Sequence, residues 1–526
     1  MLANCVWCFR TLRQGRCRIE VDSEGDYVIS STNRQPEIGF CAAIGKPASR
    51  SIGAVALLVA MVSGFPAGAD ENRQRPLQSV AEEALPVVLA QFQIPSQTPG
   101  GKAPALPKRL TYQYNYGTES EINYRMDPDL NKGVKDDVFV VTPDLEGFIT
   151  YRPTDWLEGT VEIEVLRDIS ISRQKLTTLP NGDLERAPAD RFELLIDQAH
   201  VTLKGVTDPF EFTVGRRNFE DDLHTLYDTS IDVAMVTFKP GRALRVEASV
   251  GRENFIDWDL LNSNPKDRND TYMLYSEYRG IENIKLAGYA VYRDDNLHQE
   301  GQPFLLGARS IGYPTERTNY WIDLAHVRGE DEEGRKLRGY AVNLGGTYRF
   351  ADLPFNPSFT LGYAFGSGDD PGDSSTNNEF RQTGLGSNEM RFSGVSELKI
   401  YGEVLDPELS NLHIFTAGLG FRPAEDVYLD LVYHHYELDQ FADELRNSAI
   451  TAQLNPNAIN PSKNVGDALD VVLGFRNVFG VRGLGVDVRV GWLFPGRAFR
   501  RNVGNEDEPA FRDADLGFSL VAKALF

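Results

Sequence analysis

The chain has 526 residues and a formal net charge of −22, from 54 Lys and Arg against 76 Asp and Glu. This charge argues against a simple nucleic-acid-binding protein, because phosphate requires a basic surface. Beyond the N-terminal region there is no run of about eighteen apolar residues, which excludes a helical membrane protein. A mean hydropathy of −0.34 is compatible with a membrane β-barrel, whose strands alternate apolar and polar residues.

The N-terminal region carries a segment typical of exported proteins. Residues 52–65 (IGAVALLVAMVSGF) form one apolar run, which follows Lys46 and Arg50 and precedes small residues up to Ala69. A basic segment, a short apolar segment and an A-x-A pattern are typical of a cleaved secretory signal. A membrane anchor is the alternative, but the run is short for a span. We therefore expect residues 1–69 to be an N-terminal extension with a signal peptide, cleaved after about Ala69.

The sequence on both sides of this predicted cleavage site agrees with export. All four cysteines lie upstream of it, the last being Cys41, so the processed chain would form no wrong disulfides in an oxidising compartment. Residues 70–108 are rich in Pro, Gln and Ala, a composition that favours a flexible linker. We expect this segment to be a periplasmic lead-in to one domain at 109–526.

Within 109–526 the dominant pattern is the alternation of apolar and polar residues. Val486, Val488 and Val490, for example, alternate with Asp487 and Arg489. Successive residues of a strand face opposite sides, so each such segment has one apolar and one polar face. Eighteen strands are predicted, at 109–118, 138–152, 157–168, 192–204, 209–217, 230–239, 243–252, 270–279, 284–293, 303–313, 318–328, 338–350, 357–366, 410–421, 427–437, 465–477, 484–495 and 513–526.

The connections between these strands alternate in length. Tight turns such as 240–242 and 280–283 alternate with longer polar stretches such as 253–269 and the large insert at 366–409. This alternation predicts an all-β fold, a transmembrane antiparallel β-barrel of about eighteen strands with short periplasmic turns and long extracellular loops. A large periplasmic β-sandwich or propeller also has alternating strands, but it does not predict two classes of loop, and no blade-length repeat is present.

The polar face of the predicted strands carries charges of both signs. A barrel of this width contains an aqueous channel unless loops plug it. Arg binds a carboxylate bidentately and nearby acids keep binding weak, so a mixed wall can act as a selectivity ladder; alternatively, the charges only pair across strands and rigidify the wall. The residues expected to line the pore and bind the solute are Arg217, Arg245, Arg309, Arg349, Arg489, Lys523, Glu162, Glu164, Glu277, Asp323 and Asp470.

No catalytic or metal-binding pattern stands out in the sequence. There is no G-x-S-x-G and no P-loop. His434 and His435 are neighbours on a predicted strand, so their rings point to opposite faces and cannot share a metal. The acidic segment 369–373 lacks the full spacing of an EF-hand, and a solvated loop is the better interpretation. We expect no enzyme activity, no cofactor and no metal.

Five stretches in a consistent order carry a family likeness: Val214–Asp222, Tyr227–Ile231, Phe380–Asn388, Glu408–Leu412 and Leu493–Ala498. They look like the G-R-x-x-x-x-x-D, D-T-x-I, Q-T-G-L-x-S-N and E-L-S-N-L segments and the penultimate-strand ending of the outer-membrane alginate-export barrels. The resemblance covers most of residues 110–526. It implies an Arg-rich constriction that passes a uronate polysaccharide outward, with Arg216 and Arg489 at the matching cation positions. Strand alternation, however, prefers Arg217 to Arg216 as the lumen residue.

These observations predict passive export of an acidic exopolysaccharide, an alginate-like polyuronate, through a charged pore in the outer membrane of a Gram-negative cell. The expected partners are the polysaccharide, outer-membrane lipid and lipopolysaccharide, and a periplasmic export scaffold, with no nucleic acid. A general or small-solute porin that takes up organic anions or sugars is the alternative. A barrel enzyme would need a nucleophile and a base near the outer rim, and no such pair is evident. The strongly negative charge leaves the identity of the polymer open.

Overall fold

The computed structural model describes two short N-terminal strands and most of residues 111–525. The gaps in that range are 127–129, 131–136, 171–176, 179–183, 186–190, 254, 256–257, 263–268, 296–300, 371–374, 393–395, 500, 504–505 and 509–514. The predicted signal segment, its cleavage site after Ala69 and the lead-in at 70–108 lie outside the described residues. The N-terminal strands, β1 (Cys17–Val21) and β2 (Tyr27–Ser31), form an antiparallel pair in a unit separate from residues 103–526.

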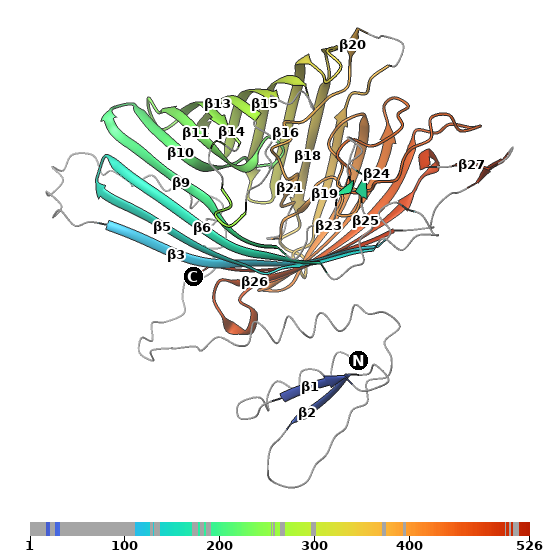
Figure 1. Cartoon of the computed structure of the whole chain (residues 1–526), viewed down its shortest axis with the longest axis horizontal. Helices are drawn as coiled ribbons and strands as arrows, with labels where there is room; N and C mark the ends of the chain where they lie inside the picture. Colours follow the sequence, from blue (N-terminus) through green and yellow to red (C-terminus); the bar gives the residue numbers. More distant parts are fainter. Residues whose placement is uncertain are drawn as a thin grey trace. The chain divides into compact units, whose positions relative to one another are not determined.

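Long antiparallel strands in the C-terminal unit close into a barrel of eighteen strands (Figure 1). They are β3 (Thr111–Arg125), β5 (Asp144–Thr154), β6 (Leu157–Ser170), β9 (Arg191–Thr207), β10 (Phe210–Glu220), β11 (Asp228–Phe238), β12 (Leu244–Arg252), β13 (Asn269–Ile281), β14 (Ile284–Asp295), β15 (Gln302–Thr315), β16 (Thr318–Glu330), β18 (Tyr340–Arg349), β19 (Ser358–Gly366), β23 (Leu412–Ala424), β24 (Val427–Leu438), β25 (Asn464–Phe475), β26 (Leu484–Pro495) and β29 (Asp515–Leu525). Each predicted strand overlaps one of them, so the predicted fold class is confirmed.

Short elements complete the described structure. Three of them extend the barrel wall: β4 (Val138–Thr142), β17 (Lys336–Leu337) and β20 (Thr376–Asn377). Three small hairpins lie outside the wall: β7 (Thr177–Thr178) with β8 (Leu184–Glu185), β21 (Glu389–Met390) with β22 (Leu398–Lys399), and β27 (Arg501–Val503) with β28 (Glu506–Glu508). The 3-10 helices are η4 (Val478–Gly480) and η5 (Arg497–Phe499). Among the described residues, no helix has the length and apolar character needed to cross a membrane.

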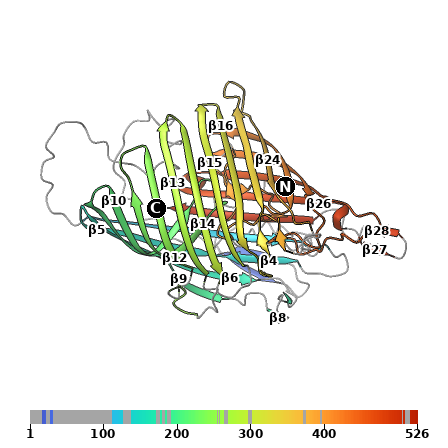
Figure 2. The ribbon, with the colours of Figure 1, turned by 90° about the horizontal axis from the view of Figure 1, so that it is seen from above.

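The alternation seen in the sequence determines which side of each strand faces outward. On β13, Thr271 and Met273 are buried, whereas Tyr272 and Leu274 are 48% and 47% exposed. Large apolar side chains repeat on the outer face of neighbouring strands, for example Ile322 and Leu324 on β16. Figure 2 shows β13, β14, β15 and β16 as successive tilted strands. An apolar outer face is what a barrel presents to lipid.

The two ends of the barrel differ in their connections, as the sequence predicts. At one end, here called the turn end, short turns such as 282–283 and 425–426 join successive strands. At the other, the loop end, the connections are mostly longer, and the longest runs from 367 to 411 between β19 and β23. In outer-membrane barrels the short turns are periplasmic and the long loops extracellular.

The interior of the barrel is packed on one side. One buried hydrophobic cluster contains inner-face residues of β10 to β26 together with residues of the 367–411 connection, among them Trp321, Phe392 and Leu405. On β6, in contrast, Thr160 lies between Glu158 and Glu162 on the inner face, and the inner face of β5 carries Asp144 and Glu146. The hydrophobic core therefore lies against β10–β26 and not against β3–β9.

Candidate functional site: a charged lumen narrowed by an internal loop

The 367–411 connection, here called the internal loop, folds into the barrel. Phe392 of this loop stacks on Trp321 of β16, with ring centroids 5.7 Å apart and an interplanar angle of 6°. The carbonyl oxygen of Phe392 accepts hydrogen bonds from Asn319 Nδ2 at 3.0 Å and Thr347 Oγ1 at 3.2 Å. Tyr401 is fully buried, and its hydroxyl accepts a hydrogen bond from Asn343 Nδ2. The internal loop is thus part of the packed interior and narrows the lumen.

Glycines on the inner wall make room for the internal loop. A Cβ atom on Gly491 of β26 would lie 2.8 Å from Val404 Cγ2, and one on Gly517 of β29 would lie 3.0 Å from the same atom. Val404 is completely buried. Side chains at these two wall positions would therefore push the loop away.

Two predicted pore residues, Arg489 and Asp470, hold the internal loop instead of facing open water. Arg489 Nη1 lies 3.3 Å from Glu389 of the loop, and its side chain is only 7% exposed. Asp470 Oδ2 accepts a hydrogen bond from the backbone N–H of Glu403 at 3.2 Å and lies 3.3 Å from His434 Nε2. Lys399 joins the network, 3.4 Å from Glu389.

Arg309 and Asp323 form a buried ionic centre. Arg309 Nε donates to Asp323 Oδ2 at 2.9 Å, and its guanidinium also pairs with Asp221. Thr225 Oγ1 accepts from Arg309 Nη2 at 2.9 Å, and the Tyr289 hydroxyl donates to Asp323 at 2.8 Å. With its side chain 1% exposed, Arg309 joins β15, β16 and the 221–227 connection.

Arg217, Arg245 and Glu277 lie on the inner face of β10, β12 and β13 in a chain of alternating charges. Glu247 lies 2.5 Å from Arg245 Nη2 and 4.0 Å from Arg217 Nη1. Arg245 is directly opposite Glu277 in the register of β12 and β13. Glu277 in turn pairs with Arg279 and, at 3.6 Å, with Lys285.

Arg216 and Arg217 lie on opposite faces of β10. Arg216 shares the alternation of Phe212 and Val214, which are 38% and 62% exposed on the outer face. Its guanidinium lies 3.8 Å from Asp232 and 5.9 Å from the centroid of the Trp258 ring. Strand alternation therefore puts Arg217, and not the position taken from the resemblance, on the lumen side.

The remaining predicted acids lie on a part of the wall where acidic side chains are more numerous than cations. Glu162 and Glu164 lie on the inner face of β6, and Glu164 is directly opposite Glu146 of β5. Glu162 accepts a hydrogen bond from Gln198, and Lys523 of β29 pairs with Glu119 of β3. These side chains are half-buried or exposed. Here, carboxylates outnumber the cations that neutralise them on the described strands.

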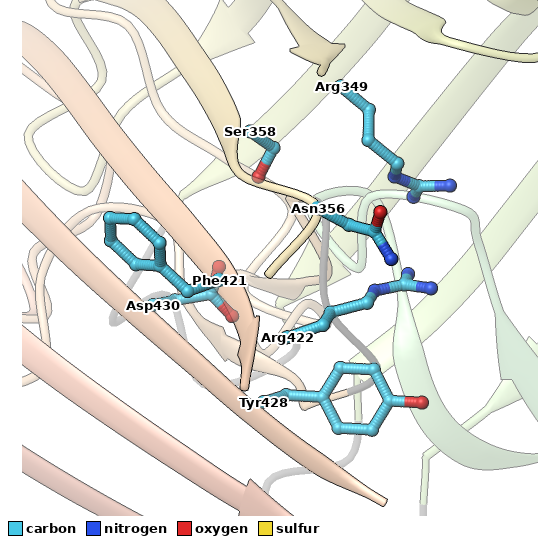
Figure 3. A pocket seen from close by; sticks show the side chains of 7 residues that line it. All are labelled: Arg349, Asn356, Ser358, Phe421, Arg422, Tyr428 and Asp430. Carbon is cyan, nitrogen blue, oxygen red and sulfur yellow. The ribbon is translucent and has the colours of Figure 1, made fainter. Parts of the chain in front are cut away.

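Arg349 lies at the turn end, where it lines a hollow with residues of three neighbouring strands. Figure 3 shows Asn356 between the guanidinium groups of Arg349 and Arg422, with the Tyr428 ring beside Arg422. Arg422 Cζ lies 5.1 Å from the centroid of that ring. Asp430 and Ser358 also line the hollow. Two cations and an aromatic ring therefore lie together on the inner wall at this end.

Arg422 is missing from the residues predicted to line the lumen. The predicted strand ended at 421, whereas β23 continues to Ala424. The alternation of inward residues Gly418 and Gly420 continues to Arg422, and following it one step further identifies this residue. The two histidines behave as expected, because His434 is buried on the inner face and His435 contacts Asp467 on the outer one. Among the described residues, no cluster of His, Cys, Asp and Glu could hold a metal.

Comparisons with known proteins agree with this architecture. A family model described as Alginate export matches residues 107–513. The alginate production protein AlgE of Pseudomonas aeruginosa is 36% identical over 114 residues, which are 22% of this chain and 22% of AlgE. AlgE of Azotobacter vinelandii is 30% identical over 139 residues, 26% of this chain and 28% of that protein. The chain therefore aligns with less than a third of either relative's length.

Solved porin structures show a weaker likeness. The structure of Pseudomonas aeruginosa OpdK with vanillate has a TM-score of 0.49 at 12% identity, with 78% of this chain and 98% of that chain covered. The family match, which spans more than half of the chain, is the decisive finding. This outer-membrane β-barrel belongs to the alginate export family.

Proposed function

We propose that the barrel is an outer-membrane channel that exports an acidic polysaccharide, an alginate-like polyuronate, by passive diffusion. The observation that carries the proposal is the hollow at the turn end, where Arg349 and Arg422 lie together on the inner wall. Because the turn end is the periplasmic end, a polymer arriving from the periplasm meets these two cations first. Guanidinium groups bind carboxylates bidentately, and Tyr428 offers a flat surface to a sugar ring.

The proposed path runs between the internal loop and the wall of β3, β5, β6 and β9. Beyond the turn-end hollow, the β10–β26 side of the interior is occupied by the hydrophobic cluster, so from there a hydrated chain has to pass along the β3–β9 side. Along the open side, Glu146 and Glu164 face each other, and this acidic pair offers uronate carboxylates no cation to bind. The polymer is attracted by the arginines at the entrance and held only weakly along the acidic wall beyond them. Weak binding along the path allows the polymer to move through the channel.

Single-channel recording in planar bilayers tests the proposal. Polyuronate oligomers added to the turn-end side are expected to block the conductance, and Arg349→Gln with Arg422→Gln is expected to weaken the block roughly tenfold or more, since two charge-assisted contacts are lost. Arg317→Gln is the matched control, because Arg317 is exposed at the same end and paired with Asp352. Equal block of the double variant and the control would contradict the proposal.

A small-solute porin for organic anions or sugars is the second candidate, and the internal loop favours it because a narrow lumen suits small molecules. The two functions predict different results in channel recordings and in a deletion strain. A porin would conduct small organic anions without any block by polyuronate oligomers, and its deletion would leave no polymer trapped in the periplasm.

We also propose the processing and the partners expected from the sequence. Residues 1–69 would be removed on export, and 70–108 would form a periplasmic lead-in to the barrel. Lipopolysaccharide and a periplasmic export scaffold are the expected partners besides the polysaccharide. N-terminal sequencing of the protein purified from outer membranes tests the first point, and crosslinking from the turn end tests the scaffold.

A further inference from the structure

Three cations lie together on the outer face of the barrel at the loop end. The register of β16 with β18 pairs His326 with Tyr340, and that of β16 with β17 pairs Glu330 with Lys336. Arg328 and Arg338 lie midway between these pairs, so they are directly opposite each other. Arg328, Lys336 and Arg338 are all exposed.

These cations differ from their neighbours in lacking an acidic partner. Among the described residues, no carboxylate lies within 4.0 Å of Arg328, Lys336 or Arg338, although Glu330 stands across from Lys336. Nearby arginines are paired, Arg335 with Asp369 at 2.7 Å and Arg381 with Glu332 at 2.5 Å. Like charges directly opposite each other destabilise a sheet. An anion from outside the chain would remove this repulsion.

The backbone beneath the cations is held firmly. β17 pairs with β16 on one side and, in parallel, with β20 on the other. The N–H of Arg338 donates to the carbonyl oxygen of Asn377 at 2.8 Å, and Leu337, between the two cations of this segment, is buried. The cations therefore project from hydrogen-bonded strands and not from an irregular loop.

Beside and below the cations, the outer face carries aromatic side chains. Tyr340, next to Arg338 on the same face, is 54% exposed and packs 5.5 Å from Phe365. Phe304 of β15 is directly opposite Arg328. Aromatic side chains on the outside of a barrel lie at the level of the lipid headgroups. The cations just beyond them therefore lie in the headgroup layer of the outer leaflet.

We propose that Arg328, Lys336 and Arg338 bind lipopolysaccharide through the phosphates of its lipid A. Lipid A combines phosphates with acyl chains, and this surface offers cations above and aromatic rings below. Two guanidinium groups side by side suit a phosphate, because each can donate a pair of parallel hydrogen bonds. This inference deepens the proposal of lipopolysaccharide as a partner by giving it a site, and it does not depend on export through the lumen, since the site lies on the outside of the wall.

Thermal unfolding of the purified full chain in detergent tests the site. Deep-rough lipopolysaccharide is expected to raise the melting temperature of the native protein, and Arg328→Gln with Arg338→Gln is expected to weaken its binding roughly tenfold or more. Arg252→Gln is the matched control, because Arg252 lies on the same outer rim and already pairs with Asp270 at 2.5 Å. The control variant should respond to lipopolysaccharide as the native protein does.

The lipid-free measurement distinguishes binding from a structural role. Without lipopolysaccharide the double variant should melt at the same temperature as the native protein or higher, because a like-charge contact is relieved. A lower melting temperature would overturn the proposal, as would an undiminished response to lipopolysaccharide. Equal stabilisation of the native protein by phosphatidylglycerol, or by dephosphorylated lipid A, would overturn the assignment to lipid A phosphates. Block by polyuronates should be unchanged throughout.

Discussion

The two sides of the barrel interior use their charges in different ways. Along β10–β26, charged residues such as Arg309 and Arg489 are buried, paired and bound to the internal loop or to connections at the loop end. Along β5 and β6, Glu146 and Glu164 are half-buried and face each other. A charge on the inner face of a barrel is therefore not in itself a contact with solute. The burial of the charged side chain and its partners decide whether it stabilises the wall or contacts the transported solute.

The largest effect is expected from breaking the packed side at its ionic centre. Arg309→Ala leaves Asp221 and Asp323 buried without their cation, and such a loss costs about 3–5 kcal/mol. Arg217→Ala, which removes a less buried pair with Glu247, should cost less than about 1 kcal/mol. Unfolding in denaturant measures the loss of stability in both variants. The folded fraction is monitored by gel mobility, which differs between the folded barrel and the heat-unfolded chain. Equal costs would mean that burial and pairing do not decide how far a charge on the inner face stabilises the wall.

A second strong effect is expected where the internal loop meets the wall. Trp321→Ala removes the stack on Phe392 and the hydrogen bond from Nε1 to Asn343, and should destabilise the protein by about 3 kcal/mol. The loop should also become sensitive to protease, and the conductance should rise. Trp156→Ala, in the exposed turn between β5 and β6, should change stability by less than about 0.5 kcal/mol. A protease-resistant loop in the Trp321 variant would argue against this docking.

A moderate effect is expected from pH, through Glu403 of the internal loop. Burial raises the pKa of Glu403 from 4.5 to about 7, Asp470 adds to the rise, and Arg489 opposes it. A carboxyl whose pKa is raised in the folded state stabilises that state fully below the ordinary value, and this stability is lost as pH rises toward 7. The loop should therefore resist protease better at pH 5 than at pH 8. Glu403→Gln should reduce the difference, and an unchanged pH profile would count against it.

The smallest effect on stability is expected on the open side. Glu164→Gln removes one of two facing carboxylates, so the free energy of unfolding should change by less than about 0.5 kcal/mol. In recordings at pH 9 the preference of the channel for cations should nevertheless fall, because the wall then carries less negative charge. Reversal potentials in a salt gradient measure this, with Glu316→Gln in an exposed turn as control. If the control shifts the potential as much, the acidic wall does not face the conducting path.

Much of the fold could be predicted from the sequence because strand alternation is a local pattern. The apolar residues on one face of each segment, together with the two classes of connection, were sufficient to predict eighteen strands and their order. The first strand is longer than predicted, β3 ending at Arg125 and not at 118. Ser120 interrupts the apolar face there, while Glu119 and Glu121 face inward, so the alternation weakens although the pairing with β29 continues.

The candidate site was less predictable, because it depends on contacts between distant parts of the chain. Alternation assigns Arg309 and Arg489 to the inner face, but not the loop residues that cover them. The docking of Phe392 on Trp321 joins residues far apart in sequence, and no local period encodes it. Arg349 and Arg422 come together only because β18, β19 and β23 are neighbours in the closed sheet.

The seam of the barrel has a consequence for how it is made. β29 pairs with β3 from Gly517 opposite Arg125 to Leu525 opposite Gly117. The ring is therefore completed by segments about 400 residues apart, and contacts between such distant segments have a large entropic cost. Until that seam forms, both edges expose unpaired backbone groups, which hydrocarbon cannot satisfy. Insertion and ring completion must therefore proceed together, late in biogenesis and with the edges shielded from other polypeptides.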